Sequence, residues 1–186
     1  MKISNNSHLT YCMNVHPGES FLEVLENIKK YALPIKKTLG CTQFGLGLRL
    51  SNMACQELKK AQNMELLKNF CTENDLYIFT INGFVYSKFH ETTVKESAYL
   101  PDWKSNERVE YTNVLASILA NLISNDFVNY GSISTVPCCF KSDKITDYDL
   151  DLMVQNILKC ISHIYNIWVS TGKDIKLALE IGRAHV

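Results

Sequence analysis

The sequence predicts an α/β fold in which parallel strands alternate with helices packed outside them. The first indication is the alternation itself, because short strand-like runs are separated by longer segments of helical periodicity. The second is the pattern within the runs, which place bulky apolar residues on one face and small or polar residues on the other. Composition agrees, since 46% of the 186 residues are hydrophobic and 20% are charged, as is typical of a globular domain.

Five runs are expected to form the strands. They are residues 8–14, 44–50, 77–82, 131–136 and 175–180. In the first run, Leu9 is expected on the apolar face, under the helices. In the third, Phe79 and Ile81 are expected on that face, and Thr80 and Asn82 on the opposite one. In the first, second, third and fifth runs, the face opposite the apolar one ends on a hydrogen-bonding or charged side chain.

The helices are predicted from apolar periodicity and from their end signals. They cover residues 20–32, 52–75, 109–123 and 150–168. Ser20 and Glu23 have the spacing of a capping box, which marks the start of the first helix. The second is expected to break near Ala61, and Gly172 is expected to end the last.

A repeated strand–helix order is compatible with two folds, a doubly wound sheet and a (β/α)8 barrel. Strands of a doubly wound sheet are covered on both faces and are usually apolar on both. One face of these runs is instead small or polar, so the sequence favours the N-terminal part of a (β/α)8 TIM barrel, with about four βα units and a fifth strand. In such barrels the active-site residues lie at the C-terminal ends of the strands.

Four stretches carry a family resemblance: HLTYCMNVHPGESF, FGLGLRLS, TINGFVYSKFHETTVKESAYLPDW and GSISTVP. Together they resemble the EboE-type metabolite traffic proteins of the bacterial Ebo operon, in the xylose isomerase-like barrel superfamily. The match runs from about His8 to Glu180, and the FH, VK and PDW elements of the third stretch are its most specific part. The resemblance implies a cytoplasmic barrel that handles a small secondary-metabolite precursor, with other Ebo-operon proteins as possible partners.

The same resemblance implies one partial barrel domain, residues 1–180, cut after its fifth strand. Residues 181–186, IGRAHV, are similar to the translated start of a common sequencing adapter and are expected to be non-native. Half a barrel would leave its first and fifth strands unpaired, so the 186-residue chain is not expected to be a stable, active monomer.

Polar residues at the strand ends are the candidate substrate contacts. Arg49 could clamp an anionic or polyol substrate through its planar guanidinium, or form a structural ion pair with Glu180. Asn14 and Asn82 could bind substrate hydroxyls, although an asparagine before Gly83 also suits a turn.

Two histidines and one glutamate complete the candidate site. His16 lies between a strand and a helix start, a place suited to acid–base catalysis at neutral pH, or it is a loop histidine satisfied by the backbone. His90 belongs to the long irregular segment 83–105, which could close over a ligand as a lid. The resemblance implies that Glu180 is a ligand for a divalent metal (Mg, Mn or Zn) in a full-length protein, with none expected in this chain alone.

Two functions are compatible with these residues: a metal-dependent isomerase or epimerase acting on a small metabolite, and a non-catalytic module that binds it or hands it over. Nineteen basic and nineteen acidic residues cancel, which argues against nucleic acid as a partner. The absence of a run of about 18 apolar residues argues against direct membrane insertion. Seven cysteines without CxxC spacing indicate reduced thiols in a cytoplasm.

Overall fold

The computed structural model describes residues 1–4, 7–87, 95–124, 128, 130–141 and 144–180. Five strands form one parallel sheet in the order β3-β4-β5-β6-β7. They are β3 (Thr10–Cys12), β4 (Phe44–Arg49), β5 (Leu76–Asn82), β6 (Tyr130–Thr135) and β7 (Asp174–Leu179). The predicted α/β class with parallel strands is confirmed. The order follows the chain without the reversal that marks a doubly wound sheet.

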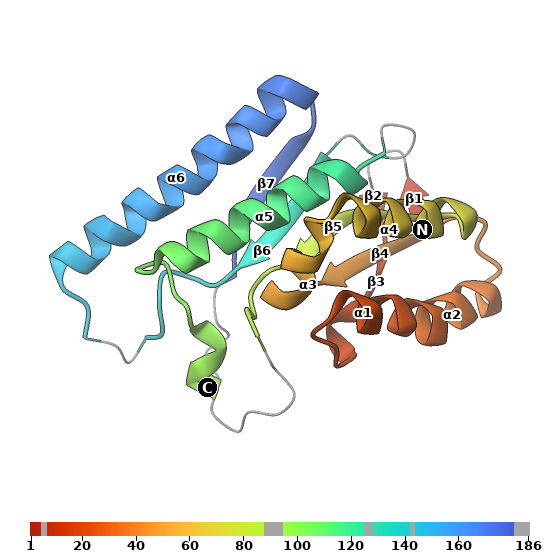
Figure 1. Ribbon diagram of the computed structural model, residues 1–186, viewed down its shortest axis with the longest axis horizontal. Coiled ribbons are helices and arrows are strands. Elements are labelled where there is room, and N and C mark those ends of the chain that lie inside the picture. The colour runs from red at the N-terminus through yellow and green to blue at the C-terminus, as the bar shows by residue number, and fades with distance from the viewer. Residues whose placement is uncertain (5–6, 88–94, 125–127, 129, 142–143, 181–186) are drawn as a thin grey trace.

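The helices connect these strands and lie together on one side of the sheet (Figure 1). They are α1 (Phe21–Asn27), α2 (Leu33–Thr38), α3 (Asn52–Leu58), α4 (Ala61–Glu73), α5 (Asn106–Leu122) and α6 (Asp147–Thr171). The predicted break near Ala61 is confirmed, as are the capping box at Ser20 and the left-handed cap at Gly172. No helix in the described part of the chain is long and apolar enough to span a membrane.

A row of aliphatic side chains crosses the helix-facing side of the sheet. Leu48, Ile81, Ile133 and Leu177 are successive neighbours on β4, β5, β6 and β7, and the first three are fully buried. Burying each such side chain stabilises the fold by about 1.5–3 kcal/mol. The helices therefore hold the sheet from one side, and its other side is free to present polar groups.

Beyond a group of aromatic rings at its N-terminal end, the inner side of the sheet, opposite the helices, carries small and polar residues as predicted. Gly47 and Thr80 are neighbours on β4 and β5, and Ser132 follows on β6. The hydroxyls of Thr80 and Ser132 lie 2.9 Å apart, within hydrogen-bonding distance. A Cβ on Gly47 would lie 3.3 Å from Thr10 Oγ1 and 3.4 Å from Thr80 Cγ2, so glycine lets these strands pack closely.

The prediction for the first strand was wrong in extent. β3 has only three residues and continues as a 3₁₀ turn, Met13–Val15, while His8 belongs to β2 (Ser7–His8), which pairs antiparallel with β1 (Lys2–Ser4). Leu9 is 50% exposed instead of lying under the helices. The reason is local, since the Leu9 amide donates to the Met1 carbonyl at 2.8 Å and turns this residue out of the sheet.

The expected position of Phe79 was also wrong. Between the pairs Leu46–Ile78 and Gly47–Thr80, β5 contains one extra residue, a bulge that places Phe79 on the inner side. Its ring lies 5.4 Å from that of His8, with the rings of Tyr77 and Tyr130 6.0 and 6.1 Å away. These aromatic rings pack at the N-terminal end of the inner side.

The first helical segment extends beyond the predicted end at Ala32. A π-helical turn, Ile28–Ala32, links α1 to α2, and Pro34 lies in the first turn of α2. The Leu33 amide donates to the Ile28 carbonyl, so the helix continues through this junction, and the π-helical turn lies where Pro34 removes one backbone donor.

Candidate functional site

The carboxyl ends of β3, β4 and β5 bring three predicted residues to one edge of the sheet. Arg49 and Asn82 are directly paired across β4 and β5. Asn14 lies in the 3₁₀ turn that follows β3, and this turn contacts β4. We call this edge, defined by Asn14, Arg49 and Asn82, the mouth.

Arg49 is almost fully buried and is held by protein groups. Its Nη1 donates to the Gly18 carbonyl at 2.8 Å, and its Nη2 donates to Glu19 Oε1 at 2.8 Å and to the Ser87 carbonyl at 3.1 Å. Its ion-pair partner is therefore Glu19, not Glu180. The remaining donor, Nε, is buried and has no hydrogen-bond partner among the described residues.

Asn14 presents a second buried polar atom without a partner. Its Oδ1 is shielded from solvent and has no hydrogen-bond partner in the described part of the chain. Buried polar atoms are nearly always hydrogen-bonded, so an unpaired one calls for a specific explanation such as a water or a ligand. Asn14 Oδ1 and Arg49 Nε can respectively accept and donate a hydrogen bond.

Asn82 forms a turn, which was the alternative to substrate binding that the sequence allowed for this residue. Its Oδ1 accepts a hydrogen bond from the Phe84 amide at 2.9 Å, which leaves its amide NH₂ as the group available for a ligand. The Gly83 amide donates to the Ser134 carbonyl at 2.8 Å and fixes the chain against β6.

His16 lies on the helix side of β3. One ring nitrogen is 2.8 Å from the Tyr11 hydroxyl, and the imidazole stacks on Tyr31 with centroids 3.9 Å apart and an interplanar angle of 6°. Tyr11 pairs with the buried Leu46, which places it on the helix-facing side. These contacts account for the position of His16 by packing, and its catalytic role stays a prediction.

The structure sets Glu180 apart from the mouth. Its backbone amide continues the pairing of β7 with β6 by donating to the Thr135 carbonyl at 2.9 Å. Strand β6 therefore lies between it and Asn82. The described residues contain no group of three histidine, cysteine, aspartate or glutamate side chains placed to hold a metal, so Glu180 lacks companion ligands there. His90 lies outside the described residues.

A cavity lies next to the Arg49–Glu19 ion pair, between the start of α3 and the segment that follows β5, and none of the three mouth residues lines it. It has a volume of about 520 Å³ and is lined by Glu19, Met53, Tyr86, Ser87 and Leu100, among others. Because Glu19 both lines this cavity and pairs with Arg49, a ligand bound here would meet the ion pair directly. The sequence did not single out Glu19, although it adjoins the capping box at Ser20.

The sequence also missed the residues that anchor this segment. Arg108, fully buried in α5, donates to the carbonyls of Pro101 at 2.7 Å, Gly83 at 2.8 Å and Phe84 at 3.2 Å. Burial lowers the pKa of Arg108 to about 10, so it remains charged at neutral pH. One guanidinium therefore ties both ends of the segment to α5.

Tyr111 and Trp103 supply further anchors. The Tyr111 hydroxyl donates to the carbonyl of Leu50, and burial raises the pKa of this phenol well above its usual value, which keeps it neutral. Trp103 Nε1 donates to the Val136 carbonyl at 3.1 Å, and Asn156 in α6 donates to the Trp103 carbonyl at 2.8 Å. The Tyr111 hydroxyl also donates to the Val85 carbonyl at 3.3 Å, so the segment is fixed to α5, to α6 and to the chain just after β6.

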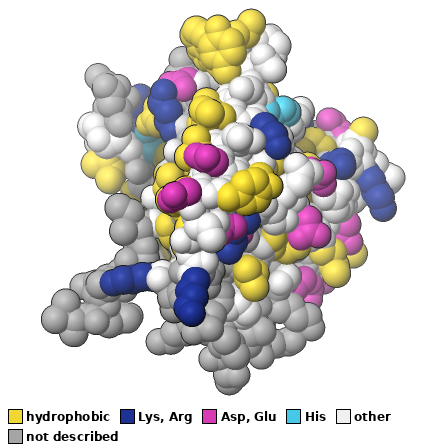
Figure 2. Space-filling model, turned by 90° about the vertical axis from the view of Figure 1, so that its left-hand side faces the viewer, with side chains coloured by type: hydrophobic (Ala, Val, Ile, Leu, Met, Phe, Trp, Pro, Cys, Tyr) yellow, Lys and Arg dark blue, Asp and Glu magenta, His cyan; other side chains and the backbone are white. Residues whose placement is uncertain are grey.

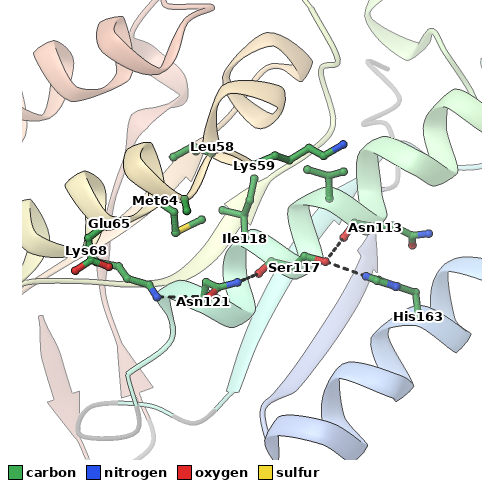
Figure 3. A pocket seen from close by; sticks show the side chains of 12 residues that line it. Leu58, Lys59, Met64, Glu65, Lys68, Asn113, Ser117, Ile118, Asn121 and His163 are labelled. Carbon is green, nitrogen blue, oxygen red and sulfur yellow. Dashed lines mark hydrogen bonds between the residues drawn. The ribbon is translucent and has the colours of Figure 1, made fainter.

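A different groove, of about 560 Å³, lies between helices (Figure 3). In it, His163 of α6 and Ser117 of α5 point toward one another, with a ring nitrogen 3.0 Å from the hydroxyl. Lys68 of α4 reaches Asn121 at 3.5 Å. None of the residues predicted for the site lines this groove.

Comparison with known proteins gives no family assignment: no family model, curated protein or solved structure matches the chain. The evidence on function is therefore the geometry of the mouth and the resemblance of four sequence stretches to the EboE-type metabolite traffic proteins.

Proposed function

We propose that the chain is part of a xylose isomerase-like (β/α)8 barrel that resembles the EboE-type metabolite traffic proteins and handles a small oxygenated metabolite at the mouth. The observation that carries the proposal is the pair of buried, unpaired polar atoms, Asn14 Oδ1 and Arg49 Nε, at the carboxyl ends of neighbouring strands. A ligand with hydroxyl groups can donate to the first and accept from the second.

The barrel part of the proposal is supported by the strand order and by the helices lying on one side. A closed barrel has eight strands, so it requires strands beyond the five described. Small and polar residues along the inner side, including Gly47, Thr80 and Ser132, suit the interior of a barrel that narrows around a ligand.

A divalent metal at Glu180 belongs to the proposal only together with ligands from further strands. One carboxylate does not make a metal site, because hard cations such as Mg²⁺ and Mn²⁺ take several oxygen ligands.

A non-catalytic binding or hand-over module is the second candidate, and a specific observation favours it. The terminal nitrogens of Arg49 are bound by protein acceptors, and the ring of His16 stacks on Tyr31 on the helix side of β3, so the described contacts of both side chains are structural. Binding through Asn14, Asn82 and Arg49 Nε needs no group that moves a proton.

The proposal is tested by measuring ligand binding to the chain with a panel of sugars, polyols and sugar phosphates, with and without added Mg²⁺, Mn²⁺ or Zn²⁺. A ligand that raises the melting temperature should bind roughly tenfold more weakly to Asn14→Ala, because one hydrogen bond to a buried group is lost. Asn82→Asp keeps the acceptor for Phe84 but removes the NH₂ donor, and is expected to weaken binding similarly.

Asn69→Ala, on the exposed surface of α4, is the matched control and should bind as the unchanged protein does. The proposal fails if no member of the panel binds, or if the mouth variants bind as tightly as the control. Turnover of a bound ligand would favour the enzyme, and binding without turnover would favour the hand-over module.

A further inference from the structure

Helix α6 carries hydrophobic side chains on two separate faces. On one face, residues such as Met153, Cys160 and Ile164 are buried in the core. A second stripe, which we call the outer stripe, is formed by Val154, Leu158, Ile161, Tyr165 and Trp168. Its members are 43–58% exposed and are spaced by four, three, four and three residues, which is the spacing of a seam between two packed helices.

Strand β7 extends this apolar surface. A groove of about 510 Å³ between α6 and β7 is lined by Tyr165, Trp168 and Leu177, among others, and Leu179 is 45% exposed on the same side. In the described part of the chain, β7 pairs on one side only, with β6. Figure 2 views the molecule from the side on which α6 lies in Figure 1, and hydrophobic side chains run along that face.

We propose that a second copy of this chain covers the outer stripe, with the two α6 helices packed antiparallel about a twofold axis at Ile161. A twofold contact uses the same patch on both copies and is closed, so it buries the stripe without forming a filament. Ile161 is the midpoint of the stripe, and an axis there gives the greatest overlap.

Charge selects the antiparallel arrangement. Asp147 and Asp151 lie at the start of α6. Antiparallel packing keeps these acidic starts apart and also opposes the dipoles of the two helices favourably. Parallel packing would set the acidic starts against one another.

The area available is near what a stable dimer needs. The outer stripe, together with Val169 and Leu179, consists of large side chains that are each about half exposed. Such a set offers on the order of 600 Å² per copy, close to the roughly 800 Å² per partner of a standard interface. The inference concerns the 186-residue chain and does not depend on the chemistry proposed for the mouth; in a longer chain that completes the proposed barrel, the elements after β7 would cover part of the same surface.

The oligomeric state tests the proposal directly. Light scattering coupled to size-exclusion chromatography should give a dimer at micromolar concentration. Leu158→Glu and Tyr165→Glu should each raise the dimer dissociation constant roughly tenfold or more, because a charge would enter the centre of the seam. Leu22→Glu in α1 and Leu66→Glu in α4 place the same charge at positions that are 65% and 48% exposed, and should leave the dimer unchanged.

Circular dichroism keeps this comparison interpretable, since each variant should retain the helical content of the unchanged chain. The proposal is overturned if the folded chain is a monomer, if it forms large aggregates that Leu158→Glu does not remove, or if the control variants dissociate as readily as the stripe variants.

Cross-linking tests the orientation. With a mild added oxidant, and in a background in which the exposed Cys12 and the partly exposed Cys41, Cys138 and Cys139 are replaced by serine, Ile161→Cys should form a disulfide with its own copy. Val154→Cys should cross-link to a Trp168→Cys copy at least roughly tenfold more than to itself, since cross-linking requires Cα atoms within about 7 Å. Self-linking of Val154→Cys at the level of Ile161→Cys would indicate a parallel pair and overturn the arrangement.

Discussion

Arg49 and Glu19 form an ion pair, with Nη2 2.8 Å from Oε1, at the carboxyl end of β4. The arginine side chain is 4% exposed and the glutamate side chain 22%. The same guanidinium also binds the carbonyls of Gly18 and Ser87, so it joins the segment before α1, the end of β4 and the segment after β5. The mouth therefore depends on one buried charge with a partly exposed partner.

Glu19→Ala is expected to destabilise the protein, because it leaves the buried Arg49 charge without its counter-ion. Breaking a fully buried pair costs about 3–5 kcal/mol, and partial exposure of Glu19 reduces the expected loss to about 1–3 kcal/mol. The free energy of unfolding in urea measures it. Glu19→Gln keeps an acceptor for Nη2 and should lose less; equal losses for both variants would show that the charge contributes nothing.

Arg108→Lys is expected to lower the free energy of unfolding by about 2–4 kcal/mol. Lysine keeps the charge but lacks the planar fork that reaches the carbonyls of Pro101, Gly83 and Phe84, so buried acceptors lose their partners. Urea unfolding gives the loss. Glu110→Gln, at an exposed site on the same helix, should change the stability by less than about 0.5 kcal/mol.

Those features of the fold that are encoded by neighbouring residues could be predicted from the sequence. The capping box of Ser20 and Glu23 and the spacing of apolar residues in α5 and α6 are local, and the five strands follow from the alternation with these helices. The mouth residues Asn14, Arg49 and Asn82 were found because the carboxyl ends of consecutive parallel strands must meet at one edge.

The failures come from contacts between distant residues. The side on which Phe79 lies depends on a bulge that is set by pairing with β4. Arg108 looks like a surface residue in the sequence, because its partners are backbone carbonyls, which carry no signal in the sequence. Tyr31, which stacks on His16, comes from a π-helical turn that periodicity does not reveal.

Gly83→Ala is expected to cost about 1–3 kcal/mol, because there is no room for a side chain between β5 and α5. A Cβ at this position would overlap Leu115 Cδ1 and lie 3.0 Å from the Ser134 carbonyl oxygen. The melting temperature measures the loss. Gly40→Asn is the control, since nothing lies within 4 Å of a Cβ there and asparagine tolerates its φ of +63°; a larger loss at Gly40 would contradict the packing argument.

Cys12 is expected to react with a thiol reagent well before the buried cysteines, because the thiolate is the reactive form and only an accessible one is attacked. Cys12 is exposed on the inner side of β3 beside Gly47, whereas Cys71 and Cys160 are buried, and burial raises the pKa of each to about 12. At pH 8 the fastest phase should lose one thiol in Cys12→Ser, the partly exposed Cys41, Cys138 and Cys139 should react more slowly, and the buried cysteines should react only as the chain unfolds. A ligand at the mouth should slow the fast phase, because Cys12 directly precedes the turn that holds Asn14. Labelling of Cys71 and Cys160 at the rate of Cys12 in the folded chain would show that the core is not closed as described.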